Sequence, residues 1–457
     1  MDTDDCMRVV IVGGGASGVL SATYLLNQHI LGLQVVLIEP KELGAGAAYG
    51  TDKPEHLLNV ATAKMSAYPD DPDHFLRWMR QNAPCDPNAF VSRSLYRHYL
   101  QHVLDDAVAG ALPNAWKVYQ SSVTSIIPHA EGATITLETG QILHTHKIIL
   151  AVGNQPPRTP ETDTPWFAED EGYINTPWIS DLAFITPDDD ILLIGTGLTT
   201  VDVLLSLNKR GHRGQITAVS RHGRWPLSHA ENTVPVFDIT TPIPHDALEG
   251  FRWVRRAIHQ AQYDNIPWQT VLDALRSHIN LLWAQASHAE RCRFTRHLMP
   301  LWNIARHRIP HNSAMVIENL TNCGQLRLIT GRLRRVDRQN SILSATISHH
   351  KTGDGVYVYP RWILNCTGPN TDLHTSDAPL LRQLFADGHL TTDPLRMGLN
   401  TAPNGAVINH IGMPSEVIYT LGSLRRGGLF ESTAIHEIRQ QAMELSQLLA
   451  NLILVHE

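Results

Sequence analysis

The sequence predicts an α/β protein that carries one βαβ plan twice, and three observations support this. Apolar strands at residues 9–12 and 191–194 each run into a glycine-rich turn. A helical stretch and a second apolar strand follow each turn, which is the order of a parallel βαβ unit. Each half later returns through an apolar strand that closes on a glycine, at Gly153 and at Gly368. We therefore predict two Rossmann-like dinucleotide-binding domains in tandem.

The first glycine-rich turn has the GxGxxG spacing of a dinucleotide-binding fingerprint. The residues expected to contact a cofactor there are Gly13, Gly15, Ala16, Ser17 and Gly18. The glycines allow a tight turn, a close approach to a pyrophosphate, and close packing of the helix on the strand. The free N–H groups at the helix N-terminus favour the anion. Glu39 ends the next strand 21 residues after Gly18, where its carboxylate can accept hydrogen bonds from ribose hydroxyls.

The second turn departs from this pattern in two ways. It runs from Gly195 through Gly197 and Thr199 to Thr200, so a threonine stands where the third glycine is expected. Because threonine is bulkier, we expect this helix to stand further from its strand. The following strand ends in a serine and Arg221 instead of an acid. Arginine can pair with a 2′-phosphate in a bidentate way, so Arg221 favours NADPH over NADH unless it merely faces solvent.

Composition excludes several other classes of protein. The chain has 457 residues, is 18% charged and carries a net charge of −7, so neither nucleic acid nor an anionic membrane is the expected partner. A basic run at residues 291–308 is too short to indicate nucleic acid, and its first arginines, Arg291 and Arg293, are interpreted as a solvated helix face. The acidic N-terminus does not resemble a signal peptide, and no apolar run reaches a membrane-spanning length. We expect a cytoplasmic protein.

The five cysteines are far apart in the sequence and form no CxxC pair. Pyridine-nucleotide disulfide reductases have the same two domains but need a redox-active cysteine pair beside the flavin. That class is therefore disfavoured. His144 and His146 alternate on a strand as a metal pair could, but no third ligand is visible nearby, so no metal site is predicted.

Several longer motifs extend beyond the fingerprints. They lie at residues 44–50 (GAGAAYG), 57–60 (LLNV), 300–310 (PLWNIARHRIP) and 422–434 (GSLRRGGLFESTA). With these motifs, almost the whole chain resembles the FAD/NAD(P)-binding proteins that include the FAD-dependent urate hydroxylase group. More distantly, it is similar to N-hydroxylating and flavin-containing monooxygenases. The resemblance implies FAD in the first domain and NADPH in the second.

The resemblance also assigns roles to individual residues. Asn59 would lie at the edge of the flavin ring, and Arg93 would neutralise the FAD pyrophosphate. The strand before Gly422 and Ser423 would face the ribityl chain, although many relatives have aspartate where Ser423 stands. A helix from Glu431 to about residue 452 would direct its N-terminus at the flavin. Ordinary turn chemistry remains an alternative for Asn59 and Ser423. Arg306 and Arg308 would line the NADPH or substrate side, and the catalytic candidates are Asn59, Arg306 and Arg308.

We predict three segments along the chain. Residues 1–158 form the first part of the FAD-binding domain, and a run of prolines from residue 156 marks its end. Residues 159–368 form the NAD(P)H-binding domain, with a helical insertion at about 242–310. Residues 369–457 complete the FAD-binding domain.

The function implied by these features is an FAD-dependent, NADPH-reduced monooxygenase. Its substrates would be dioxygen and a small polar nitrogen compound, hydroxylated either at an amine or amino-acid nitrogen or on a heterocycle. Two alternatives remain open at this point: an FAD/NAD(P)H oxidoreductase that inserts no oxygen, and a non-catalytic flavoprotein sensor. Relatives are often dimers or tetramers, but the sequence leaves the oligomeric state of this chain open.

Overall fold

The structure is a computed structural model that describes residues 7–81, 84–178, 180–230, 237–239, 243–244, 246–339, 342–349 and 353–454. The acidic start of the chain lies outside these residues. Two compact units divide the chain. Unit 1 contains residues 1–52, 60–155 and 371–457, and unit 2 contains residues 53–59 and 156–370.

Unit 1 is built on a six-stranded sheet in the order β15-β16-β7-β1-β2-β3. The strands are β1 (Met7–Val12), β2 (Leu33–Ile38), β3 (Trp116–Tyr119), β7 (Lys147–Leu150), β15 (Ala406–Ile408) and β16 (Pro414–Thr420). All neighbouring strands run parallel except β15, which pairs antiparallel with β16. The central strands are buried runs of β-branched and aliphatic residues, as expected for a parallel sheet covered on both faces.

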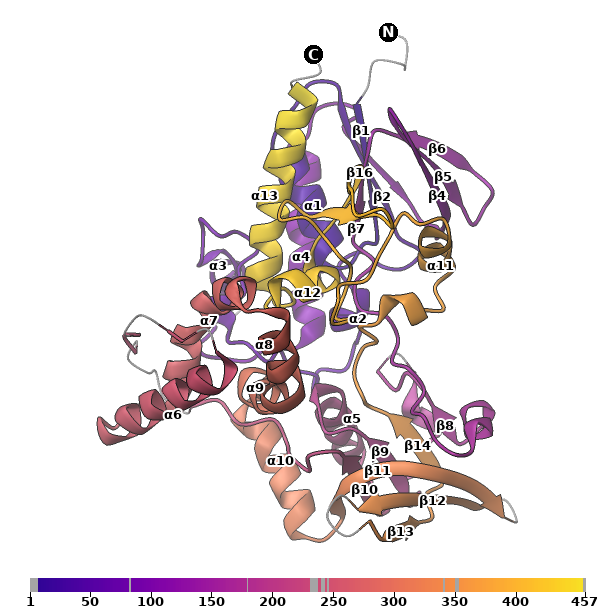
Figure 1. The fold of residues 1–457 in the computed structure, drawn as a ribbon, viewed down its shortest axis with the longest axis vertical. Coiled ribbons are helices and arrows are strands. Elements are labelled where there is room, and N and C mark those ends of the chain that lie inside the picture. Colours follow the sequence, from indigo (N-terminus) through magenta and orange to yellow (C-terminus); the bar gives the residue numbers. More distant parts are fainter. Residues whose placement is uncertain are drawn as a thin grey trace. The chain divides into compact units, whose positions relative to one another are not determined.

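Three long helices belong to this unit. They are α1 (Ala16–Leu26), α4 (Arg93–Ala109) and α13 (Ile435–Leu454). Figure 1 shows α13, in yellow, running beside α1, and α1 packs extensively against both α13 and α4. Smaller elements complete the unit: α2 (Gly46–Tyr49), α3 (His74–Arg80), α11 (Pro379–Ala386), α12 (Arg426–Leu429), and an antiparallel sheet of β4 (Val123–His129), β5 (Gly132–Leu137) and β6 (Ile142–Thr145).

Unit 2 repeats the plan on a seven-stranded sheet in the order β13-β12-β11-β10-β9-β14-β8. The strands are β8 (Tyr173–Ile174), β9 (Ile191–Ile194), β10 (Ile216–Ser220), β11 (Leu326–Gln339), β12 (Ile342–His349), β13 (Gly355–Val358) and β14 (Trp362–Asn365). The strands from β8 to β11 are parallel, and β12 and β13 add an antiparallel extension. This arrangement confirms the predicted fold class of two Rossmann-like units.

The helices of unit 2 lie in two connections between parallel strands, one from β9 to β10 and the other from β10 to β11. The helix after the second glycine turn is α5 (Leu198–Lys209), and α10 (His311–Asn322) packs against it. Between β10 and α10 come α6 (Ala247–Tyr263), α7 (Trp268–Gln285), α8 (His288–Arg293) and α9 (Met299–Arg306). These helices lie within residues 242–310, the stretch for which the sequence predicts a helical insertion. Asp246 caps α6 by accepting hydrogen bonds from two backbone N–H groups at its start.

Two expected elements differ in the structure. The apolar strand expected to close on Gly153 covers residues 142–150 in the sequence but forms two strands, β6 and β7, because the chain bends at His146, whose Nδ1 accepts a hydrogen bond from the Arg8 backbone N–H at 2.9 Å. The expected helix from Glu431 begins only at Ile435. Phe430, with φ of 53°, takes the chain out of helical geometry and leaves Glu431 in the loop before α13.

Candidate functional site

The first glycine turn meets the expected requirements for close packing. Gly13 has φ of 107°, and a Cβ there would lie 2.4 Å from the Ala151 carbonyl oxygen. A Cβ on Gly18 would lie 1.8 Å from the Gly13 carbonyl oxygen. The Gly13 N–H donates to the Ile38 carbonyl at 2.9 Å. The carboxyl ends of β1, β2 and β7 therefore meet at this turn, which is where open α/β sheets bind ligands.

Glu39 and a second glycine-rich segment lie against the same turn. The Glu39 carboxylate accepts a hydrogen bond from the Gly14 N–H at 2.7 Å. The Gly44 N–H donates to the Gly14 carbonyl at 2.8 Å, and a Cβ on Gly46 would stand only 3.1 Å from the Gly15 Cα. Residues 44–50 thus lie over the fingerprint, a contact that spacing alone did not reveal.

The C-terminal part of the chain returns to this turn. The Thr420 hydroxyl at the end of β16 donates to the Leu150 carbonyl at 2.7 Å. Gly422 has φ of 72°, and a Cβ on it would lie 2.8 Å from Ser17 Oγ, so only glycine fits. The structure therefore brings Gly422, and Ser423 after it, to the start of α1. Gly153 closes β7 at the same edge with open space around its Cα.

The second glycine turn repeats the φ angle, the backbone hydrogen bond and the close Cβ contact of the first. Gly195 has φ of 112°, donates its N–H to the Val219 carbonyl at 2.8 Å, and would place a Cβ 2.4 Å from the Cys366 carbonyl oxygen. Thr200 fills the position of the third glycine, and its hydroxyl donates to the Gly195 carbonyl at 2.9 Å. The first helical residue after the turn is Leu198, so Thr199 lies in the first turn of α5.

The matching hydrogen bonds align the two units residue by residue. Gly13 donates to the residue before Glu39, and Gly195 donates to the residue before Ser220. Ser220 therefore stands where Glu39 stands in unit 1, and its hydroxyl accepts from the Gly223 N–H at 3.1 Å. Arg221 follows directly and is exposed. The acid of the first site is replaced by a short hydroxyl next to a cation.

Two further arginines lie at the same edge of the unit 2 sheet. Arg224 follows Arg221 in the loop, and Arg332 lies on β11 two residues beyond Thr330, the register partner of Ser220. All three are exposed, and among the described residues no hydrogen bond or ion pair holds their guanidinium groups. Sequence reasoning missed Arg332, because its position depends on the pairing of β11 with β10.

A dinucleotide fits both turns. Neither α1 nor α5 has a side-chain cap, so the first N–H groups of each helix remain available for an anion. A Cβ on Gly197 or Gly368 would meet no atom within 4 Å, which leaves space for a phosphate to approach the second turn. Bound FAD would be held by residues of the first turn, Glu39 and Gly422, and bound NADPH by the second turn and Arg221.

The remaining predicted site residues occupy other positions. Asn59 belongs to the short segment of unit 2, and its carbonyl lies 3.0 Å from His229 Nε2. Arg93 is partly buried at the first position of α4, and Arg306 ends α9. Arg308 is buried against the Trp268 ring and ion-paired with Asp273, which indicates a structural contact within the helical insertion. The predicted roles of these residues stay proposals.

The Cys366 thiol is buried and chemically unsuited to thiol–disulfide exchange beside a flavin. Burial raises the pKa of this thiol to about 12, against the opposing hydrogen bond to Thr200. A thiol with so high a pKa supplies almost no thiolate. The other cysteines that the structure describes are Cys85, Cys292 and Cys323, all of them free.

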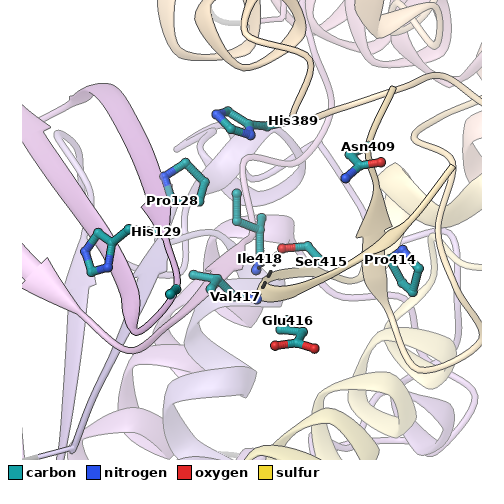
Figure 2. A pocket seen from close by; sticks show the side chains of 10 residues that line it. Pro128, His129, His389, Asn409, Pro414, Ser415, Glu416, Val417 and Ile418 are labelled. Carbon is teal, nitrogen blue, oxygen red and sulfur yellow. Dashed lines mark hydrogen bonds between the residues drawn. The ribbon is translucent and has the colours of Figure 1, made fainter. Parts of the chain in front are cut away.

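A cavity of about 280 Å³ lies elsewhere in unit 1 (Figure 2). Its lining includes His129, His389, Asn409 and Glu416. It follows β16 from Pro414 to Ile418, and its lining includes neither Gly422 nor any residue of the fingerprint. The cavity is therefore distinct from the site at the glycine turn.

Neither a metal site nor a membrane-spanning helix is found among the residues that the structure describes. No group of three or more His, Cys, Asp or Glu side chains there could hold a metal ion. Among those same residues, no helix is long and apolar enough to cross a membrane.

Comparisons with known proteins point to flavoenzymes. A family model described as FAD-NAD(P)-binding matches residues 10–155. The L-aspartate N-monooxygenase (nitrosuccinate-forming) of Streptomyces davaonensis is 24% identical over 262 residues, a match that spans 46% of this chain and 40% of that relative.

Solved structures show the same fold over nearly the whole chain. The ornithine N-hydroxylase of Kutzneria sp. 744, in complex with reduced FAD, NADP⁺ and L-ornithine, has a TM-score of 0.65 at 14% identity, covering 98% of this chain and 99% of that one. The FAD-bound cadaverine monooxygenase of Erwinia amylovora has a TM-score of 0.66 at 12% identity, covering 97% and 94%.

Proposed function

We propose that the protein is an FAD-dependent, NADPH-reduced monooxygenase that hydroxylates a nitrogen atom of a small polar amine or amino acid. The observation that carries this proposal is the pair of glycine turns with matching hydrogen bonds, one beside Glu39 and the other beside Ser220 and Arg221. Similarity to N-hydroxylating enzymes supports an amine nitrogen over a purine-like heterocycle as the site of oxygen insertion.

When bound, the cofactors would supply the redox chemistry: transfer of a hydride from NADPH to FAD and activation of dioxygen, with one oxygen atom entering the substrate and the other leaving as water. The protein binds and orients these groups. The N–H groups at the start of α1 and α5 hold the two pyrophosphates, and the Glu39 carboxylate accepts hydrogen bonds from a ribose. Arg221 pairs with the 2′-phosphate that distinguishes NADPH from NADH.

Anaerobic mixing of the FAD-loaded protein with NADPH, and separately with NADH, tests the proposal. We expect bleaching of the flavin absorbance that is faster with NADPH. After air is admitted with L-aspartate, L-ornithine or cadaverine present, a hydroxylamine product should form. Failure to bind FAD would refute the proposal. Hydrogen peroxide formed in equal amount to the NADPH consumed, with no hydroxylated product from any amine, would favour an oxidoreductase that inserts no oxygen.

A further inference from the structure

Two adjacent arginines near the first glycine turn have contrasting environments. The Arg425 guanidinium is buried and donates to the Pro403 carbonyl at 2.6 Å. The guanidinium of Arg426, the next residue, makes no hydrogen bond and no ion pair within the part of the chain that the structure describes. It lies over the Phe430 ring, whose centroid is 5.8 Å from Arg426 Cζ.

Arg426 is also withdrawn from water. It is partly buried, and this desolvation lowers the pKa of its guanidinium, while the Glu431 carboxylate acts in the opposite direction. A desolvated cation without a hydrogen-bonded anion is unfavourable, because the interaction with a ring face replaces only part of its hydration. Such an arrangement is explained when a ligand supplies the missing anion.

The backbone beside Arg426 is strained in a way that maintains this environment. Phe430 has φ of 53° and ψ of −62°, a region that bulky residues avoid. The Phe430 N–H donates to the Arg426 carbonyl at 2.8 Å, and the Glu431 N–H donates to the Leu429 carbonyl at 2.6 Å. This tight turn holds the Phe430 ring next to the guanidinium. Strained residues of this kind gather at ligand sites, where the surrounding structure fixes them.

The loop that carries Arg426 is fixed beside the candidate FAD site. Four residues before it, Gly422 packs against Ser17 of the fingerprint. The Leu424 carbonyl accepts from the Leu399 N–H at 2.8 Å, and Gly427 has no room for a side chain because the Asp393 carboxyl group occupies that space. Arg426 is therefore held at a set position within unit 1, four residues after the glycine that packs against the fingerprint.

We propose that Arg426 binds the carboxylate of the substrate, so that the substrate class is amino acids and not simple amines. This inference rests on the proposed function. The guanidinium fork matches a carboxylate in a bidentate way, and the Phe430 ring restricts its orientation. A phosphate of FAD offers the same oxyanion chemistry, but the N–H groups of the uncapped α1 helix already serve the pyrophosphate.

The test uses the FAD-loaded full-length protein and three variants. Arg426→Gln removes the charge, Arg426→Lys keeps it without the fork, and Arg382→Gln changes an exposed arginine of the same unit as a control. Calorimetric titration with L-aspartate, L-ornithine and succinate measures carboxylate binding, and titration with cadaverine measures binding of an amine without a carboxylate. FAD content and the rate of anaerobic flavin bleaching by NADPH are recorded for each protein.

We expect Arg426→Gln to weaken binding of the carboxylate ligands by roughly 10- to 100-fold, with partial recovery in Arg426→Lys. FAD content, NADPH-driven bleaching and the behaviour of Arg382→Gln should match the unchanged protein. Three results would overturn the inference: unaltered carboxylate binding in Arg426→Gln, no carboxylate binding by the unchanged protein, or loss of FAD from Arg426→Gln, which assigns Arg426 to a phosphate. Failure of the unchanged protein to bind FAD or to be bleached would instead refute the proposed function.

Discussion

At the scale of single residues, the main difference between the two glycine turns is the side chain at the end of the second strand, Glu39 in unit 1 and Ser220 in unit 2. The first glycines of the two turns have similar φ angles, 107° and 112°, and a Cβ on either would lie 2.4 Å from a carbonyl oxygen, so both turns have the geometry that accepts a pyrophosphate. The side chain at the end of the second strand then decides which ribose is accepted. In unit 1 this side chain is a carboxylate that would repel a 2′-phosphate, and in unit 2 it is a hydroxyl beside Arg221.

Replacement of Arg221 by glutamine should change the choice of nicotinamide cofactor. We expect kcat/KM for NADPH to fall by about 10- to 100-fold, because a charge-assisted bidentate pair is lost, while kcat/KM for NADH stays unchanged. Arg327→Gln is a matched control, since Arg327 is also exposed in unit 2 but lies near the amino end of β11. Steady-state flavin reduction with both cofactors provides the measurement, and an equal loss for NADH and NADPH would contradict the assignment.

Thr200 shows how the same turn tolerates a larger residue. The sequence predicts a helix further from its strand, since threonine replaces the third glycine. In unit 1, a Cβ on Gly18 would come within 1.8 Å of a backbone oxygen, so no side chain could fit. In unit 2, the Thr200 hydroxyl instead donates a hydrogen bond to the Gly195 carbonyl at 2.9 Å. The helix and the turn of unit 2 are thus joined by a hydrogen bond where unit 1 has direct backbone contact.

At the scale of elements, three tyrosines hold an irregular segment next to α4. The Tyr96 hydroxyl donates to the Met65 carbonyl at 2.9 Å, and Tyr24 donates to the Ala67 carbonyl at 2.9 Å. The Tyr99 oxygen accepts from the Ala67 N–H at 3.0 Å and lies 2.7 Å from His74 Nδ1. Because the Tyr99 oxygen already accepts one hydrogen bond, a neutral His74 ring that accepts the Tyr99 proton completes the network.

This network predicts a loss of stability in mild acid. Desolvation lowers the pKa of His74, so the unfolded chain takes up a proton below the ordinary pKa of about 6.5 and the folded chain does not. Its contribution to the free energy of unfolding is therefore lost as the pH falls through that value, until the lowered folded pKa is reached. Asp71 and Asp106 oppose the shift, and Arg77 adds to it.

His74→Gln should flatten this part of the pH profile. Urea unfolding at pH 7.5 and at pH 5.5 gives the difference in free energy, which should be smaller in the variant than in the unchanged protein. His98→Gln, at an exposed position of α4, should retain the full difference. A profile for His74→Gln that matches the unchanged protein would show that His74 does not titrate differently on folding.

The elements predicted well from sequence are those with local signals. Both βαβ units follow from short apolar strands, glycine turns and a helical period, and these patterns are complete within about 30 residues. The β11–β12 extension was missed because β11 alternates arginines with aliphatic residues and reads as a polar surface stretch. The late start of α13 was missed because it depends on the positive φ angle of Phe430, a conformation that the residue type does not predict.

The residues of the candidate site also fall into two groups, those with a local sequence signal and those whose environment depends on packing. The fingerprint residues, Glu39, Gly422 and Arg221 lie at the ends of recognisable strands, and their positions follow from the sheet. The environment of Arg426 could not be predicted, because its lack of a partner is a property of packing and not of sequence spacing. The contacts of Arg308 with Trp268 and Asp273 could not be predicted for the same reason.

At the scale of the whole molecule, the order of the chain interleaves the two units. Residues 53–59 belong to unit 2, although the residues on both sides of them in the sequence belong to unit 1. This segment lies along α5: His56 Nε2 is 2.8 Å from Ser206 Oγ and 3.2 Å from the Asp202 carbonyl oxygen, and Glu55 is paired with Lys209. The helix that follows the second glycine turn is therefore anchored by a piece of chain tied at both ends to unit 1.

The structure predicts that His56 stabilises α5 specifically. His56 is 4% exposed and stacks on Trp178 with ring centroids 4.9 Å apart, so His56→Ala would leave a cavity and remove a hydrogen bond from Ser206. We expect a loss of roughly 2–4 kcal/mol in the stability of this region.

Hydrogen exchange measured by mass spectrometry on the FAD-loaded full-length protein separates the two units. In His56→Ala, amides of residues 198–209 should exchange faster, whereas those of residues 16–26 and the FAD content should not change. Pro54→Ala, at an exposed position of the same segment, should leave both regions unaltered. Equal acceleration in α1 and α5 would mean that His56 acts on general stability, and no acceleration in α5 would mean that the segment does not anchor this helix.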